Sequence, residues 1–520
     1  MILALACIAL VGGVLLVVIA VMRWYLSPDI AVLSRLQSGL YSLSEVVQAE
    51  LSACRGTSGA GDDRRQQILR VRGQQARVYD KFAAEFLRSE TAREHHAPAS
   101  TSMPLFLPLL SKPDKVFVLS DLDLAKWVLS DATTFDRSQT LESFADAFQL
   151  DSVFTTKDAS LYRDLRSFFA HSTNGLSSDQ YETMMATFQR RVDSMLSTFA
   201  GSAGVPFIPK VEGMVLEAYA DAFFGMRTFP NADECAILIK RIWQIKSLRN
   251  NIPSHRWNPL LRLRMRRQQS RLFRIIEEAQ ALVNDVDSSV ADEMAKVYIA
   301  NGHGPGNLLN ALIPLYEAIS RGVVYALFEL ASSQSVQEEL REEIARHSDD
   351  ELEYCKSTNT LLHRVWKETL RLRPPTPNQT RRVTTGHNAL FPIGSKVAIV
   401  WSVFHLDPDV WGPDATEFRP QRWIGVTGEQ EQNYRPFGMG VQECVAQNYG
   451  SFGGRVMLKR IVESTSIQHK GDGPTTGRVG TDRGYSRGPD PDASILRFVR
   501  RTQGTDVSSD DHRVSRNVDD

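Results

Sequence analysis

The stretch RPFGMGVQECVAQN, residues 435–448, places a single cysteine, Cys444, on a loop with two glycines behind a Pro-Phe pair. Glycine has no Cβ, so Gly438 and Gly440 allow the loop to turn sharply and to bring its backbone close to a bound group. The chain has 5 cysteines, which are too few and too scattered for a disulfide framework or a Cys-x-x-Cys metal site. Cys444 is therefore interpreted alone, either as a buried free thiol or as a single ligand.

Length and charge bound the class of function. With 520 residues and 42% hydrophobic composition, the chain can form one large domain or two ordinary ones. Lys and Arg together number 60 and Asp and Glu number 61, so the net charge of −1 gives no basic excess for nucleic acid. We therefore expect no nucleic-acid partner.

Residues 1–23 form a predicted transmembrane anchor. The run from Ile2 to Met22 contains no charged residue, and about 20 apolar residues suffice to cross a bilayer. A cleaved signal peptide would have a shorter apolar region after a basic start, and no basic residue precedes this run. Arg23 and Arg35 follow it, which by the positive-inside rule leaves the rest of the chain in the cytosol. The expected protein is single-pass with a cytosolic body.

The body is predicted to be mostly α with minor β. Residues 24–64 are expected to be a linker and the start of the body, 65–501 the catalytic domain, and 502–520 a disordered polar tail. The polar residues 468–492 are expected to form a long surface loop. Residues 115–121, KVFVLSD, alternate like a strand, and 122–131 return to a helical pattern.

The middle of the chain contains three predicted helices. Residues 307–332 are apolar nearly all round, which indicates a buried central helix, interrupted by Pro314. Charged residues 335–347 form the next helix, and 359–373, NTLLHRVWKETLRLR, form a third that two prolines end. Residues 396–404, KVAIVWSVF, are a further strand candidate.

The helix at 359–373 carries a carboxylate on its apolar face. Leu361, Val365, Glu368 and Leu372 lie along one stripe, and Arg371 follows Glu368 by one turn. Burying this carboxylate unpaired would be costly. The residues alone leave two interpretations, an ordinary surface Glu-Arg pair and a buried one.

Three motifs in order resemble the cytochrome P-450 superfamily. That family has a Glu-x-x-Arg helix, then Phe-x-Pro-Glu-Arg-Phe/Trp, then Phe-x-x-Gly-x-Arg-x-Cys-x-Gly around the cysteine that ligates haem iron. The matching residues here are Glu368 and Arg371, then FRPQRW at 418–423, then Phe437, Gly440 and Cys444. The resemblance covers most of residues 65–500 and implies the cytochrome P-450 fold, a helical bundle around haem b with small β-sheets.

The resemblance also implies roles for single residues. Cys444 would be the axial thiolate ligand of the haem iron, whose chemistry such a thiolate promotes by donating electron density. Glu368, Arg371 and Arg422 would form the buried charge network that holds the cysteine loop. The candidate partners of the haem propionates are Tyr162 and Arg166 in YRDLR, together with Arg382 and His405. His405 could equally be a satisfied structural histidine.

The chain departs from the family pattern at several positions. Gln442 stands where the family usually has a basic residue, Gln421 replaces the usual Glu, and Ala446 replaces a glycine. In the central helix, PLYEA at 314–318 lies over the family's Ala-Gly-x-Asp/Glu-Thr. Glu317 keeps the acid, but Ala318 replaces the threonine that normally helps to deliver protons to bound dioxygen.

Two functions of different class remain open. The first is a monooxygenase of the endoplasmic reticulum membrane that hydroxylates, epoxidises or similarly oxidises a lipophilic small molecule, with electrons from a separate NADPH-cytochrome reductase. The degenerate motifs favour a fungal secondary-metabolism enzyme. The second is a haem-thiolate isomerase or dehydratase that rearranges an oxygenated substrate without external electrons. A haem-binding sensor without turnover would be expected to have no substrate pocket.

Overall fold

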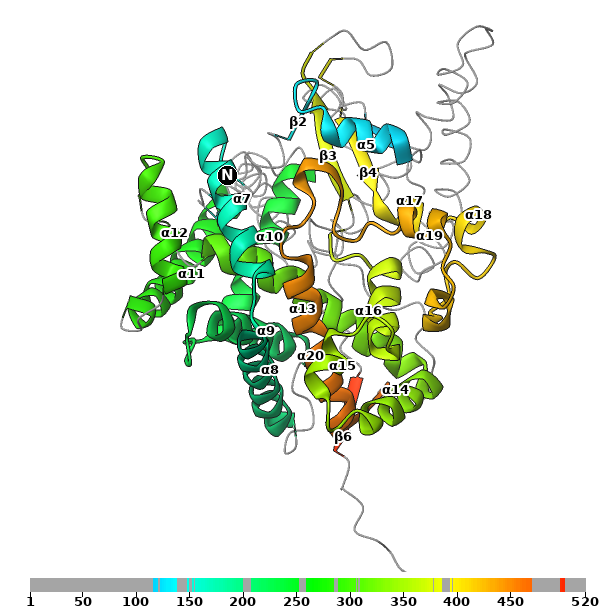
Figure 1. The fold of residues 1–520 in the computed structure, drawn as a ribbon. Coiled ribbons are helices and arrows are strands. Elements are labelled where there is room, and N and C mark those ends of the chain that lie inside the picture. Colours follow the sequence, from blue (N-terminus) through cyan, green and yellow to red (C-terminus); the bar gives the residue numbers. More distant parts are fainter. Residues whose placement is uncertain are drawn as a thin grey trace, which may run out of the picture.

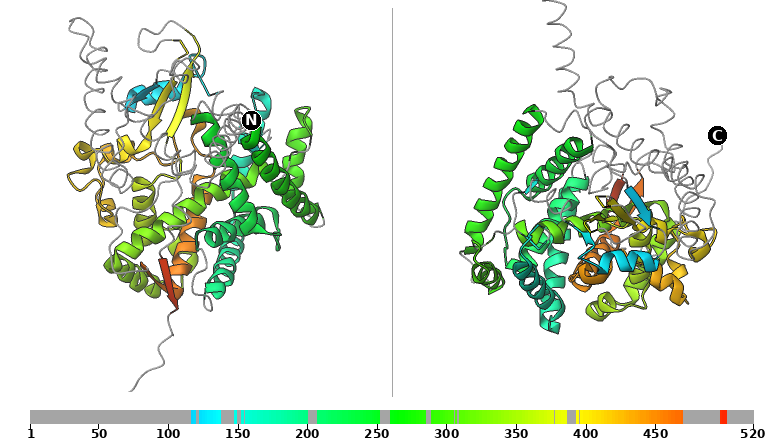
Figure 2. Two further views of the ribbon diagram at one scale, coloured as in Figure 1. Left: turned by 180° about the vertical axis from the view of Figure 1, so that it is seen from behind. Right: turned by 90° about the horizontal axis from the view of Figure 1, so that it is seen from above.

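The computed structural model describes residues 116–119, 122–137, 147–148, 152–153, 155–199, 207–251, 259–284, 289–304, 306, 309–376, 378–385, 393–394, 396–469 and 496–500. Within these ranges helices predominate over two small sheets (Figures 1 and 2), so the mostly helical prediction is correct. The predicted anchor at 1–23, the linker at 24–64, the tail at 502–520 and most of the polar loop at 468–492 lie outside the described residues.

The helices run through the whole described chain. They are α5 (Leu122–Ser130), α7 (Ala159–Asn174), α8 (Ser178–Phe199), α9 (Phe207–Phe224), α10 (Ala232–Asn251), α11 (Pro259–Asn284), α12 (Ser289–Ala300), α13 (Leu309–Ser332), α14 (Gln334–Arg346), α15 (Glu351–Lys356), α16 (Leu361–Leu372), α17 (Trp401–His405), α18 (Pro408–Trp411), α19 (Gly428–Asn433) and α20 (Gln447–Ser464), with the 3-10 turns η2 (Pro420–Trp423) and η3 (Gly440–Gln442).

The larger sheet has the strand order β1-β4-β3-β2, formed by β1 (Val116–Leu119), β4 (Lys396–Val400), β3 (Asn378–Val383) and β2 (Phe135–Asp136). β1 pairs with β4 in parallel, and the other pairs are antiparallel. A separate hairpin joins β5 (Thr465–His469) to β6 (Leu496–Arg500). Strand β3 and helix α5 both lie beside the cysteine loop, through Arg381 with Gln442 and through Leu129 with Gly440.

The strand predicted over 396–404 was wrong in its second half. The strand ends at Val400, and α17 begins at Trp401. Trp401 and Phe404 are both buried in the same apolar cluster. Side chains three residues apart share one face of a helix but lie on opposite faces of a strand, so burying both favours the helix.

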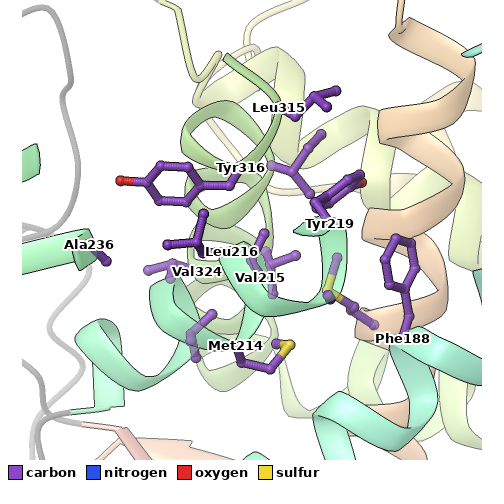
Figure 3. Packing of buried hydrophobic residues seen from close by; sticks show 14 of the residues in the cluster. Phe188, Met214, Val215, Leu216, Tyr219, Ala236, Leu315, Tyr316 and Val324 are labelled. Atoms are coloured by element: carbon purple, nitrogen blue, oxygen red, sulfur yellow. The ribbon is translucent and has the colours of Figure 1, made fainter. Parts of the chain in front are cut away.

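Helix α13 is the central core helix, as its composition predicts. It packs closely on α9 and α20, and Figure 3 shows Leu315, Tyr316 and Val324 of α13 among the α9 side chains. The predicted interruption at Pro314 does not occur, because the helix continues from Leu309 to Ser332. Proline removes one backbone hydrogen bond, but packing of α13 on α9 and α20 keeps this part of the chain helical.

Helix α16 is positioned against this core by Trp366. A Cβ at Gly322 of α13 would lie 2.7 Å from the Trp366 ring, and one at Gly454 of α20 would lie 2.3 Å from it. The absence of side chains at both glycines makes room for the indole, which is 2% exposed. The three helices are thereby packed in close contact at this ring.

One described helix segment, Asn310–Ser332, is long and apolar enough to cross a membrane, but 88% of its apolar window is buried inside the fold. Its burial identifies it as the core helix α13.

Candidate functional site

The carboxylate of Glu368 is the centre of a buried hydrogen-bond network. Its side chain is 0% exposed and accepts two bonds from Arg371, each 2.8 Å long. It accepts further bonds from Arg422 Nε at 2.8 Å, from Trp423 Nε1 at 3.0 Å and from the Arg419 N–H at 3.0 Å. The structure therefore brings Glu368, Arg371 and Arg422 together as a buried cluster, and the surface-pair interpretation does not hold.

The two arginines extend this cluster to the backbone that precedes the cysteine loop. Arg371 donates to the carbonyl oxygens of His405 at 2.7 Å and Ala415 at 2.6 Å. Arg422 donates to the carbonyl oxygen of Asp414 at 2.9 Å. Charge-assisted bonds of this kind are stronger than neutral ones, so α16 and the segment 405–423 are held as one unit.

The cysteine loop requires glycine at two positions. Gly438 has φ 75° and Gly440 has φ 74°, in the left-handed region that disfavours other residues. A Cβ at Gly438 would also lie 3.0 Å from the Gln379 side chain. The turn closes with a bond of 3.0 Å from the Cys444 N–H to the Phe437 carbonyl oxygen.

Helix α7 holds the backbone on both sides of the cysteine. Arg166 donates to the carbonyl oxygen of Glu443 at 2.8 Å. Asn174 and Thr173 donate to the carbonyl oxygen of Val445 at 2.8 Å and 3.3 Å. The carbonyl groups of the residues before and after Cys444 are thus held by one helix.

The thiol of Cys444 differs from the other described cysteines. Cys235 and Cys355 are buried, and burial raises the pKa of each thiol. Cys444 is exposed, although the protein atoms crowded around it also raise its pKa. The Ala446 N–H and the positive charge of Arg166 act in the opposite direction and favour the thiolate. Cys444 is the described cysteine that can reach a ligand.

Strand β3 places one arginine on the cysteine loop. Arg381 is 6% exposed and donates to the side-chain oxygen of Gln442 at 2.5 Å. Arg382, which the sequence favoured, is the cross-strand partner of Asp136 and points to the opposite face. Alternation along the strand therefore distinguishes the two arginines, and sequence reasoning missed Arg381.

Two of the predicted haem contacts, Tyr162 and Arg382, and the unpredicted Arg435 have the following surroundings. The guanidinium of Arg137 lies 4.1 Å from the ring centre of Tyr162. The Nε atoms of Arg382 and Arg435 are buried and have no hydrogen-bond partner among the described residues. A buried donor without a partner is costly, so both atoms are suited to an anionic group such as a carboxylate.

His405 has both ring nitrogens engaged within the protein. Its Nδ1 lies 3.0 Å from the Arg371 carbonyl oxygen, and its Nε2 accepts the Arg435 N–H at 2.8 Å. The ring is 0% exposed, and burial lowers its pKa to about 3. This geometry favours the structural alternative, in which a neutral His405 links α16 to the cysteine loop.

Helix α13 carries the two predicted catalytic positions. Glu317 forms an ion pair with Arg321 one turn later, and Arg321 also donates to the Pro375 carbonyl oxygen at 3.1 Å. The Ser320 hydroxyl donates to the backbone carbonyl of Glu317 at 3.2 Å. Ala318 contributes only a methyl group. The hydroxyl of Ser320 is therefore bonded to the helix backbone, and the charge of Glu317 is balanced by that of the buried Arg321.

A second ion pair lies close to Glu317. Glu212 of α9 is 3.5 Å from the Lys240 ammonium of α10. Burial raises the pKa of Glu212, Lys240 and Arg321 lower it, and the negative charge of Glu317 raises it. The four side chains form a charge-balanced group between α9, α10 and α13.

A surface hollow of about 510 Å³ adjoins the outer side of the cysteine loop. Burial and the neighbouring Arg455 and Lys367 lower the pKa of its His363 to about 3. Its charged lining consists of Lys356, Lys367, Arg435 and Arg455 together with Glu431 and Glu443. The hollow is thus mainly basic.

Comparisons with known proteins agree with this geometry. The cytochrome P450 family model matches residues 106–478, which include the α16 network, the cysteine loop and α13. The chain belongs to the cytochrome P450 family. Members of this family are generally haem-thiolate monooxygenases, and membership implies a thiolate-ligated haem.

The curated relatives of this P450 are eukaryotic. Cytochrome P450 714A2 of Arabidopsis thaliana is 30% identical over 160 residues, 29% of this chain and 30% of the relative. The probable cytochrome P450 313a1 of Drosophila melanogaster is 31% identical over 163 residues, 29% of this chain and 33% of the relative. Cytochrome P450 6a8 of the same species is 31% identical over 161 residues, which are 29% of this chain and 32% of the relative. The matched segments span about a third of each relative's length.

The residues present fit a thiolate-ligated haem. Cys444 offers an exposed sulfur on a loop whose two left-handed glycines permit close approach. Arg435, on the loop itself, offers an anionic propionate a buried Nε that has no partner among the described residues. An acidic or fully apolar surrounding would not have suited such a group.

Proposed function

We propose that this P450 is a membrane-anchored monooxygenase that oxidises a lipophilic small molecule with electrons from a separate NADPH-dependent reductase. The observation that carries the proposal is the exposed thiol of Cys444 on a loop held by α7 and by the Glu368 network. The haem would supply the oxidation chemistry when bound. The protein would position the haem, the substrate and the protons.

The roles of the chain's own residues follow from their contacts. Cys444 would bind the iron as thiolate, and the positive charge of Arg166 favours that state. Arg166 and Arg435 would neutralise the propionates, and Arg382, which leaves β3 on the face opposite Arg381, stays a predicted third partner. Glu368 would keep the loop in register with the helical core, because it accepts bonds from both arginines of the network.

Proton delivery would depend on Glu317. Ala318 has no hydroxyl, so a proton at this position of α13 would have to be held by water bound to Glu317 or by a hydroxyl group of the substrate. Glu317 pairs with Arg321, and its side-chain oxygens can accept a hydrogen bond from such a water. A placed donor of this kind is typically worth about 10² to 10⁴ in rate.

The basic hollow supports docking of the reductase. Four basic and two acidic side chains line the hollow, and a partner with an acidic surface would be attracted by the excess of positive charge. Attachment to the endoplasmic reticulum by residues 1–23 would place both proteins on one membrane. A place in fungal secondary metabolism stays a prediction from the degenerate motifs.

A second candidate is a haem-thiolate isomerase or dehydratase. The observation in its favour is the same methyl group at 318 beside a neutralised Glu317, because a rearrangement without external electrons needs no proton delivery to dioxygen.

Labelled dioxygen separates the two candidates. The purified full chain is incubated under ¹⁸O₂ with cell extracts that supply candidate substrates, with and without reductase and NADPH. A monooxygenase gives a product that carries one labelled oxygen atom and forms only with both present. Conversion at full rate without any electron donor and without label would overturn the proposal in favour of the isomerase. Cys444→Ala serves as the control that should lose either activity.

A further inference from the structure

The cysteine loop carries a carboxylate directly beside its thiol. Glu443 precedes Cys444, and it is the one charged residue in the sequence from Gly440 to Asn448. Gln442, at the position where the family usually has a basic residue, is neutral and accepts its hydrogen bond from Arg381 of β3 at 2.5 Å. The backbone around the thiol therefore contributes one negative charge and no positive charge of its own.

The backbone of Glu443 is fixed, whereas its carboxylate has no partner. The N–H of Glu443 donates to the Gly440 carbonyl oxygen at 3.0 Å, and its carbonyl oxygen accepts the bond from Arg166 at 2.8 Å. Among the described residues the carboxylate takes part in no hydrogen bond or ion pair. The residue is half-buried and lines the hollow beside the loop. Its charge is thus held near Cys444 and is not cancelled by a direct contact.

Two basic side chains of the same hollow contact other groups instead of Glu443. Arg455 donates to the carbonyl oxygen of Ser357 at 3.0 Å. The ammonium of Lys367 lies 3.9 Å from the ring centre of Trp423. Both cations are therefore held by their own partners, and neither pairs with the carboxylate beside the thiol.

The chain itself limits the distance between this charge and the sulfur. Consecutive Cα atoms are about 3.8 Å apart, so the Glu443 carboxylate lies within about 12 Å of the Cys444 sulfur in any rotamer. At an effective dielectric constant of about 20, a unit charge at about 12 Å changes an equilibrium that involves another unit charge about tenfold. The carboxylate is thus close enough to act on a group bound at the sulfur.

We propose that Glu443 lowers the reduction potential of the haem bound at Cys444. One electron from the separate reductase adds a negative charge to the haem, no bond is formed or broken, and a nearby carboxylate opposes the added charge. Glu443 thereby offsets the positive charge of Arg166, and the haem stays oxidised until a sufficiently strong reductant is present. The proposal rests on the proposed ligation of the haem iron by Cys444.

Spectroelectrochemical titration of the purified, haem-loaded full chain measures the midpoint potential. At a fixed applied potential, we expect Glu443→Gln to raise the ratio of reduced to oxidised haem about tenfold, a shift of about 59 mV for one electron. Glu443→Lys reverses the charge and should raise the ratio about 100-fold. If Glu443→Gln loads no haem, Glu443→Ala removes the same charge and replaces it in the comparison.

Two control variants separate charge from shape and from general surface effects. Glu443→Asp keeps the charge and should keep the potential of the parent. Glu431→Gln removes an exposed carboxylate from the same hollow, and it should change the ratio less than about twofold, because water and salt screen that charge. A purely structural role of Glu443 would change haem content and the unfolding midpoint but not the potential.

The reduced carbon monoxide complex of the parent is recorded first. A parent without the red-shifted Soret band would overturn the ligation by Cys444 and the proposal with it. With a normal band, an unchanged potential in Glu443→Gln and Glu443→Lys, an equal shift in Glu443→Asp, or an equal shift in Glu431→Gln would each overturn the role of Glu443 alone.

Discussion

Replacement of Glu368 by glutamine tests the network that links α16 to the cysteine loop. The substitution keeps the size of the side chain but removes its charge. Glu368 receives five hydrogen bonds, from Arg371 twice, Arg422, Trp423 and the Arg419 N–H. A glutamine offers one acceptor oxygen, and its amide N–H groups would face donors.

The expected cost follows from burial. Glu368 and Arg371 are both 0% exposed and Arg422 is 7% exposed, so water cannot replace the lost partner. Breaking a buried ion pair by removing one partner costs about 3 to 5 kcal/mol. Glu338→Gln on α14 is the matched control, because it removes a carboxylate that pairs with Arg341 but is 56% exposed. Such surface pairs are worth about 0 to 1 kcal/mol.

Equilibrium urea unfolding, followed by tryptophan fluorescence, measures both variants. We expect Glu368→Gln to lower the unfolding free energy by several kcal/mol and to yield little haem-loaded protein, whereas Glu338→Gln should stay close to the parent. A loss in Glu368→Gln no larger than that in the control would refute the idea that this cluster fixes the loop.

Four further outcomes are expected. Cys444→Ser should abolish the red-shifted Soret band of the reduced carbon monoxide complex, and an unchanged band would place the ligand elsewhere. Glu317→Ala should sharply lower turnover, and Ala318→Thr should reduce wasteful peroxide release; an isomerase would be indifferent to both. Burial holds the pKa of His363 at about 3 against 6.5 when unfolded. Below pH 6.5 the unfolded chain therefore binds a proton that the folded protein does not bind, and the unfolding free energy falls towards pH 3 by about 1.4 kcal/mol per pH unit. His363→Gln should flatten this slope in urea unfolding at pH 7 and pH 5, and an equal slope would contradict the assignment. Deletion of residues 1–26 should release the body at least partly from microsomes, whereas full retention after carbonate extraction would place the anchor elsewhere.

The local motifs were readable from the sequence because each is a short pattern with one dominant physical requirement. Glu368 and Arg371 lie one helical turn apart, so their pairing depends on the helix alone. The glycines at 438 and 440 predicted a sharp turn, and both have positive φ. The central helix was evident from its apolar composition.

Other features depend on tertiary context and could not be read in this way. The choice between Arg381 and Arg382 depends on which face of β3 meets the loop, which the pairing with β2 and β4 decides. The change from strand to helix at Trp401 depends on an apolar cluster formed by distant segments. Arg321 was not predicted, although it pairs with Glu317 one turn away; only its second contact, to the carbonyl oxygen of Pro375, depends on a distant segment.

The hydrogen bonds from α7 to the carbonyl oxygens of Glu443 and Val445 affect the free energy of haem binding. Ordering a free loop residue costs about 1 to 2 kcal/mol of backbone entropy. Here that ordering is completed during folding, through bonds made by Arg166, Thr173 and Asn174. These contacts help to place the sulfur, and to that extent less of the binding energy of the haem is needed to order the loop.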